Sequence, residues 1–135
     1  MGKYNSILKF NNYIVDEIRY KTNNEFKDSE EGTSIDINIV PKIDIKDNNL
    51  NITLITNIFN NAVENNYPFE MKIDITGYFS TEGDSPDKFL RNAIAILYPY
   101  VRSIVSTYTA SANITPLILP AINVNKLIED QLEKD

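Results

Sequence analysis

The sequence lacks two residue types on which most catalytic and metal sites depend, because its 135 residues contain neither cysteine nor histidine. This excludes disulfides, thiol nucleophiles, Ser-His-Asp triads and nearly all zinc sites. Tryptophan is also absent. The longest apolar run, residues 93–101, is far shorter than the roughly twenty residues that cross a membrane. We therefore expect no cofactor, no metal and no membrane insertion.

The charge balance is acidic, with 13 Lys and Arg against 19 Asp and Glu, a net charge of −6 and a pI near 4.6. Such a field repels phosphates, so we expect no nucleic-acid partner. The first residues show no apolar signal core, which predicts a cytoplasmic protein. The chain length suits one domain, residues 1–135, that buries its own core.

Period-two alternation predicts strands in the first part of the chain. In the first strand the apolar side chains expected on one face are Leu8, Phe10, Ile14, Ile18 and Tyr20. In the second strand they are Ile35, Ile37, Ile39, Ile43 and Ile45. Pro41 cannot donate a ladder hydrogen bond, which indicates a sheet edge or a bulge. Between these strands, residues 22–34 are expected to form a polar loop with Phe26 as its one large apolar residue.

The next two strands complete the predicted sheet. Residues 47–49 are typical of a hairpin turn. Residues 50–63 are apolar on both faces, with Phe59 and Val63 on the second, which predicts a cover on that face too. A fourth strand begins at Phe69, and Gly77 near its end indicates a bulge or a close backbone approach. Four strands joined in chain order predict an antiparallel meander.

The spacing then changes to that of helices. Ser85 is a typical N-cap, and apolar residues recur every three or four positions through residues 90–109, where Pro99 should break or bend the helix. Residues 114–120 should be extended between prolines, and Asn123 should cap a last helix. Strands followed by helices, without alternation, predict an α+β fold with helices packed on one face of the sheet.

Four short motifs in this order resemble the SecB protein-export chaperone family. They are Glu-Ile-Arg-Tyr at residues 17–20, Gly-Tyr-Phe-Ser at 77–80, Leu-Tyr-Pro-Tyr-Val-Arg at 97–102, and Ile-Thr-Pro-Leu-Ile-Leu-Pro-Ala-Ile-Asn-Val at 114–124. We expect Arg102, in the third motif, to form an ion pair with a neighbouring helix or subunit.

The resemblance implies a homotetramer, built as a dimer of dimers with helices between sheets. It also implies an ATP-independent holdase that binds unfolded or preprotein clients in hydrophobic grooves and passes them to the SecA motor. The client-binding candidates in this sequence are Phe26, Tyr98, Tyr100, Tyr108, Ile114, Leu117, Leu119 and Val124.

The sequence departs from the family where the motor would bind. Glu17 matches one acidic position of the motor patch, but Lys21 and Lys72 stand where further acidic residues are expected. A reversed charge redirects the choice of partner. The partner is therefore either a SecA-type motor or another protein, such as one of a toxin–antitoxin module.

Two other function classes compete with the holdase. A dedicated module for one partner would have the same fold and differ only in promiscuity. An enzyme would have to use paired carboxylates such as Asp36 with Asp44 or Glu70 with Asp74. These alternate with lysines on regular strands, as solvent-facing residues do, so we predict that the protein is not an enzyme.

Overall fold

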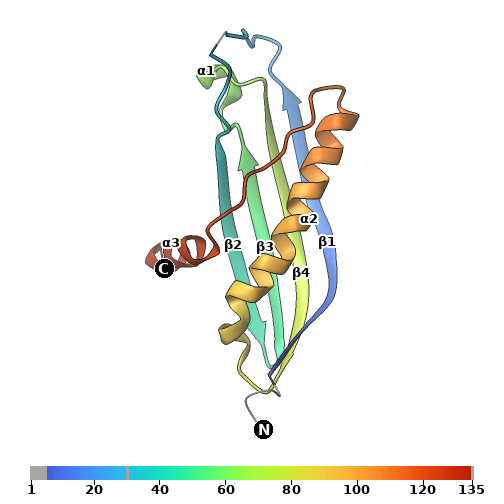
Figure 1. Ribbon diagram of the computed structural model, residues 1–135, viewed down its shortest axis with the longest axis vertical. Helices are drawn as coiled ribbons and strands as arrows, with labels where there is room; N and C mark the ends of the chain where they lie inside the picture. Colours follow the sequence, from blue (N-terminus) through green and yellow to red (C-terminus); the bar gives the residue numbers. More distant parts are fainter. Residues whose placement is uncertain (1–5, 30, 135) are drawn as a thin grey trace.

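A computed structural model describes the backbone of residues 6–29 and 31–134, and the side chains as far as residue 130. It contains a four-stranded antiparallel sheet followed by helices on one face, which confirms the predicted fold class (Figure 1). The strands are β1 (Ile7–Thr22), β2 (Ile37–Lys46), β3 (Asn49–Ile58) and β4 (Phe69–Glu82). The helices are the short α1 (Ala62–Asn65), the 3-10 turn η2 (Pro86–Phe89), α2 (Leu90–Ser111) and α3 (Val124–Lys134).

The strand order is β1-β4-β3-β2, so only β2, β3 and β4 form a meander. The prediction that all four strands pair in chain order was wrong, because β1 lies beside β4 and returns to β2 by a long connection. This is a Greek-key arrangement. This order leaves β1 and β2 as the two edges of the sheet. Pro41 lies on β2, so its predicted edge position is confirmed, and the missing N–H group is tolerated there.

Two register shifts interrupt β1, one between Phe10 and Asn12 and one between Val15 and Glu17. Each inserts an unpaired residue, and each therefore switches the face on which later side chains lie. Tyr13 consequently lies opposite Gly77 on the helix side, whereas Ile14 is 47% exposed on the other face. The predicted face was correct at both ends of the strand and wrong at Ile14.

Helix α2 crosses the sheet diagonally and supplies one side of the core (Figure 1). It runs unbroken from Leu90 to Ser111 with Pro99 inside, so the alternative of two separate helices was wrong. Gly77 allows its close approach, since a Cβ there would lie 2.9 Å from the Phe79 ring and 3.0 Å from Leu97 Cδ1. The expected close backbone approach at Gly77 is confirmed.

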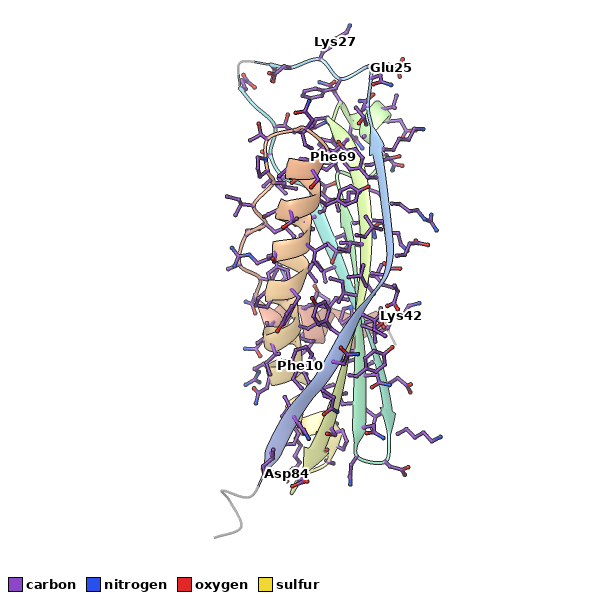
Figure 2. All side chains as sticks on the ribbon, turned by 90° about the vertical axis from the view of Figure 1, so that its right-hand side faces the viewer. Phe10, Glu25, Lys27, Lys42, Phe69 and Asp84 are labelled. Atoms are coloured by element: carbon purple, nitrogen blue, oxygen red, sulfur yellow. The ribbon has the colours of Figure 1, made fainter. Side chains whose placement is uncertain are left out.

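The sheet has one covered face and one open face within the described chain. Figure 2 shows α2 on one side only, with Phe10 and Phe69 labelled near that side and Lys42 on the other. The predicted second cover over residues 50–63 was wrong, because β3 ends at Ile58 and the later apolar residues leave the strand. Phe59 turns into the core with a φ of 55°, and Val63 lies exposed on α1.

Residues 114–123, which we call the strap, connect α2 to α3 without helix or strand and cross the same face of the sheet (Figure 1). The strap ends where α3 begins beside β2. The Lys126 N–H donates to Asn123 Oδ1 at 3.0 Å, which confirms the predicted N-cap. Ser85 precedes η2 in an extended conformation but its hydroxyl makes no capping hydrogen bond. None of the described helices is both long and apolar enough to span a bilayer.

Candidate peptide-binding groove

A groove of about 850 Å³ lies between the strap and one end of the sheet, on the face that α2 covers. It combines the end of the β1–β2 loop, the chain on both sides of α1, the C-terminal end of α2 and the start of the strap. The lining residues are Thr33, Ile35, Phe59, Pro68, Phe69, Ala110, Asn113, Ile114, Thr115, Pro116 and Leu117. Among the residues that the structure describes, none in the lining is charged, so the groove suits an apolar occupant.

Aromatic packing shapes the floor of the groove. The ring of Phe59 meets Phe69 edge-on with centroids 5.1 Å apart and lies 4.9 Å from the ring of Tyr67. The left-handed backbone of Phe59 makes this possible, because it turns the chain at the end of β3 while the Phe59 N–H still donates to the Asp36 carbonyl at 2.8 Å. The aromatic floor is buried, with Phe59 3% and Phe69 4% exposed, and Ile35, 40% exposed, stands at its rim.

The strap forms one wall, and side chains of α2 hold its backbone. Thr109 Oγ1 accepts from the Leu117 N–H at 2.9 Å, and Ser106 Oγ donates to the Leu117 carbonyl at 2.8 Å. Further along the strap, Arg102 Nε donates to the Leu119 carbonyl at 3.0 Å, and the Tyr98 hydroxyl donates to the Pro120 carbonyl at 2.5 Å. These four residues recur every three or four positions, so one helix face carries them all.

Arg102 and Tyr98 therefore bind the backbone of the strap and are not positioned to bind a peptide in the groove. No acidic side chain pairs with Arg102 in the described part of the chain, where its partner is the Leu119 carbonyl, so the expected ion pair with a neighbouring helix is not formed there. An ion pair with another subunit stays a prediction. Burial raises the pKa of the Tyr98 hydroxyl, which keeps it protonated as a donor.

The opposite wall is pinned by Asn23 at the end of β1. Its side-chain amide donates to the carbonyls of Ala62 and Tyr67 at 3.2 and 2.9 Å, and its N–H donates to the Pro68 carbonyl. Asn66 holds the next part of the loop, accepting from and donating to the Lys27 backbone at 2.9 Å each. The wall beside Pro68 is therefore fixed, because the loop and the α1 turn are joined.

The structure brings two of the sequence candidates, Ile114 and Leu117, into the groove. It places the other six elsewhere. Leu119 and Tyr98 are buried in the core, Tyr100 and Tyr108 pack against aromatic residues of β1, Val124 packs from α3 against the core, and Phe26 lies half-buried in the β1–β2 loop.

Sequence reasoning missed most of the groove lining. Alternation places Ile35 and Phe59 on faces of regular strands, and it gives no signal at Pro68. Their positions in the sequence could have identified them. Ile35, Phe59 and Pro68 each stand near the start or end of a strand, close to turn-forming asparagines or serine.

The open face of the sheet carries an ion-pair network around Glu17. Its carboxylate lies 2.9 Å from Arg19 Nε and 3.2 Å from Lys72 Nζ, and Lys72 also lies 2.8 Å from Asp74. The hydrogen bond that Lys72 donates to Glu17 holds the pKa of Glu17 below its usual value, and the one that Lys72 donates to Asp74 raises the pKa of Lys72. The predicted motor contact is thus already neutralised by neighbours.

Comparison with known proteins gives a consistent result. Residues 18–135 match the family described as preprotein translocase subunit SecB. An uncharacterised protein of Methanocaldococcus jannaschii is 38% identical over 125 residues, which cover 87% of this chain and 79% of that protein. The protein-export protein SecB of Anaplasma phagocytophilum is 33% identical over 81 residues, 55% of this chain. That alignment spans only 51% of the SecB protein's length.

Two solved structures have a similar fold. A SecB-like chaperone of Mycobacterium tuberculosis, in complex with a peptide from an antitoxin, aligns with a TM-score of 0.66 and 15% identity, covering 90% of this chain and 93% of that one. A Streptococcus agalactiae protein of unknown function aligns with a TM-score of 0.53 over 86% of this chain and 98% of that one, also with 15% identity. At these identities the likeness is one of fold.

Proposed function

This chain belongs to the SecB family, and on that premise we propose that it is an ATP-independent holdase for unfolded polypeptides or preproteins. The observation that carries the proposal is the groove between the strap and the end of the sheet, whose described lining residues carry no charge. A holdase needs adaptable apolar surface and no reactive group, which suits a chain without cysteine or histidine.

The groove would act through many weak contacts. Fully burying one leucine-sized side chain contributes about 1.5–3 kcal/mol, and part of that offsets the ordering of the client. Several client side chains must therefore be buried together. Ile118 on the strap, 70% exposed and outside the groove lining, extends the apolar surface beyond the groove itself.

The outer edge of β2, near which α3 lies, would add backbone pairing. Asp36 directs its carbonyl to Phe59 on the β3 side, so strand alternation directs the backbone groups of Ile37 and Ile39 away from β3. An extended client leaving the groove at Ile35 would meet these groups and add a strand. Pro41 has no N–H and would end the pairing.

We also propose that the chain assembles as a homotetramer, a dimer of dimers. Small exposed residues follow one face of α2 at four-residue spacing, which allows close helix packing: Ala95, Pro99, Ser103, Thr107 and Ser111. The edge strand β1 exposes Ile7, Ile14 and Val15. Replacing Ser103 with arginine should reduce the mass measured by light scattering, whereas Asn38→Arg on the open face should leave it unchanged. An unchanged mass for Ser103→Arg would place the interface elsewhere.

A dedicated module for one partner is the second candidate. The SecB-like chaperone of Mycobacterium tuberculosis, which has a similar fold, is in complex with a peptide from an antitoxin. A SecA-type motor is a less suitable partner for this chain, because Lys72 neutralises Glu17. Catalysis by paired carboxylates is not supported either, since Glu70 accepts from the Ala62 N–H and Asp74 pairs with Lys72.

The proposal is tested by light scattering of several unrelated proteins diluted from denaturant, without nucleotide. We expect the chain to suppress the aggregation of all of them at near-stoichiometric ratios. Protection of one client only would replace the holdase with the dedicated module. Protection of none would contradict the general holdase and leave the dedicated module, whose one partner need not be among these proteins.

A further inference from the structure

The first part of the strap, residues 114–117, forms one wall of the groove, and its course is set where α2 ends. Asn113 has a φ of 64°, and its N–H donates to the Ala110 carbonyl at 3.2 Å. The N–H of Ile114 donates to the Thr109 carbonyl at 3.3 Å. These two bonds form a Schellman motif, which ends many helices and reverses the chain. Figure 1 shows the strap leaving the end of α2 and turning back across the sheet.

Thr109 holds both ends of this wall. Its carbonyl accepts from the Ile114 N–H, and its Oγ1 accepts from the Leu117 N–H at 2.9 Å. The Thr109 hydroxyl donates its own hydrogen to the Val105 carbonyl at 2.8 Å, one turn earlier in α2. A hydroxyl whose hydrogen is used in this way keeps its lone pairs free to accept. One residue of α2 therefore closes the loop of residues 114–117 through both its backbone and its side chain.

Thr109 acts on the groove only through the strap. Its side chain is fully buried, and it is not among the described residues of the lining. Ile114 and Leu117, the two residues that it holds, are half-buried and line the groove. Pro116, which stands between them in the lining, adds stiffness because its ring fixes φ. The position of three lining residues thus depends on a hydroxyl that a client would not touch.

We propose that Thr109 is a positioning residue for client binding, because it holds residues 114–117 in place before a client arrives. The proposal rests on the client-binding function proposed for the groove. Without the Thr109 hydroxyl, the Leu117 N–H loses its acceptor and the wall gains conformational freedom. A client must then order the wall as it binds, which lowers affinity even where every client contact is retained.

Thr56 on β3 provides a matched control. It is fully buried like Thr109, but its Oγ1 has no hydrogen-bond partner among the described residues, and it lies outside the described lining of the groove. Replacing either threonine with valine exchanges a buried hydroxyl for a methyl group of similar size. Of the two replacements, only Thr109→Val removes a hydrogen bond to the strap. Thr109→Ser keeps the oxygen and loses a methyl group, so it should preserve the bond to the Leu117 N–H.

The test measures the affinity of a labelled, permanently unfolded polypeptide together with the hydrogen exchange of the Leu117 amide. We expect Thr109→Val to weaken binding about fivefold, the change that corresponds to one lost hydrogen bond. The Leu117 amide should exchange faster in this variant, by a larger factor than the amides of β4, since opening of the strap is local. Thr109→Ser and Thr56→Val should bind within about twofold of the wild-type chain.

Wild-type affinity of Thr109→Val would overturn the proposal, as would equal losses of affinity for Thr109→Val and Thr56→Val. Equal acceleration of exchange at Leu117 and in β4 would also overturn it, because Thr109 would then support the whole fold rather than the wall. The wild-type chain distinguishes a failure of the proposed function. If that chain binds no unfolded polypeptide, the groove is not a client site and Thr109 positions no client, whatever the exchange of Leu117 shows.

Discussion

Replacing Leu119 with alanine should lower the free energy of unfolding by about 3 kcal/mol, within the range of roughly 2–5 kcal/mol for buried leucines. Leu119 is fully buried in the core and is the residue through which the strap is anchored under α2. Truncation removes its apolar contacts and leaves a cavity that the strap cannot close, because Arg102 and Ser106 hold the backbone on either side.

The neighbouring residue provides the control. Ile118 is 70% exposed on the same strap, so Ile118→Ala should change stability by less than about 0.5 kcal/mol. Urea unfolding at one fixed protomer concentration measures both variants, because assembly makes stability depend on concentration. Similar losses for the two variants would show that Leu119 does not anchor the strap. A small loss of stability with a large loss of client binding would show that Leu119 binds clients, as the sequence predicted.

The sequence alone was sufficient to predict those strands, turns and helix ends that depend on the pattern of neighbouring residues. Strands β2 and β4 follow from strict alternation, the turn at Asp47 from residues that tolerate a positive φ, and the start of α3 from the Asn123 cap. Gly77 was identified because a glycine within a strand needs a reason, and the close approach of Leu97 supplies it.

The position and register of β1 could not be obtained in this way. Alternation shows which residues share a face but not which strand lies beside them, so the pairing of β1 with β4 was missed. The two register shifts are likewise set by the partner strand, and a single inserted residue sends Ile14 to the opposite face.

The site was only partly predictable, for a related reason. The aromatic and leucine residues of α2 and the strap predicted a surface that binds apolar clients. Their spacing does not show which of them are buried in the core and which lie on the surface. Tyr98 and Leu119 proved to be buried because a polar row on α2 binds the strap backbone. The groove itself joins residues from four separate segments, and only the fold brings Ile35, Phe59 and Ile114 together.

The central claim, that the groove binds extended apolar client segments, predicts a large effect of one added charge. Ile35 stands at the groove rim and is 40% exposed, so Ile35→Asp should leave the fold intact. It removes apolar surface from the contact and places a carboxylate where a client would be buried. Losing an isoleucine contact of about 1.5–3 kcal/mol weakens binding roughly 10- to 100-fold.

Ile45 offers a closely matched control, because it is 42% exposed on the same face and lies at the far end of β2, outside the groove. The deciding measurement is the affinity of a labelled, permanently unfolded polypeptide for the wild-type chain and for the Ile35→Asp and Ile45→Asp variants. The account predicts at least tenfold weaker binding for Ile35→Asp and wild-type binding for Ile45→Asp. Equal affinities for the two variants, or no binding to the wild-type chain, would contradict it.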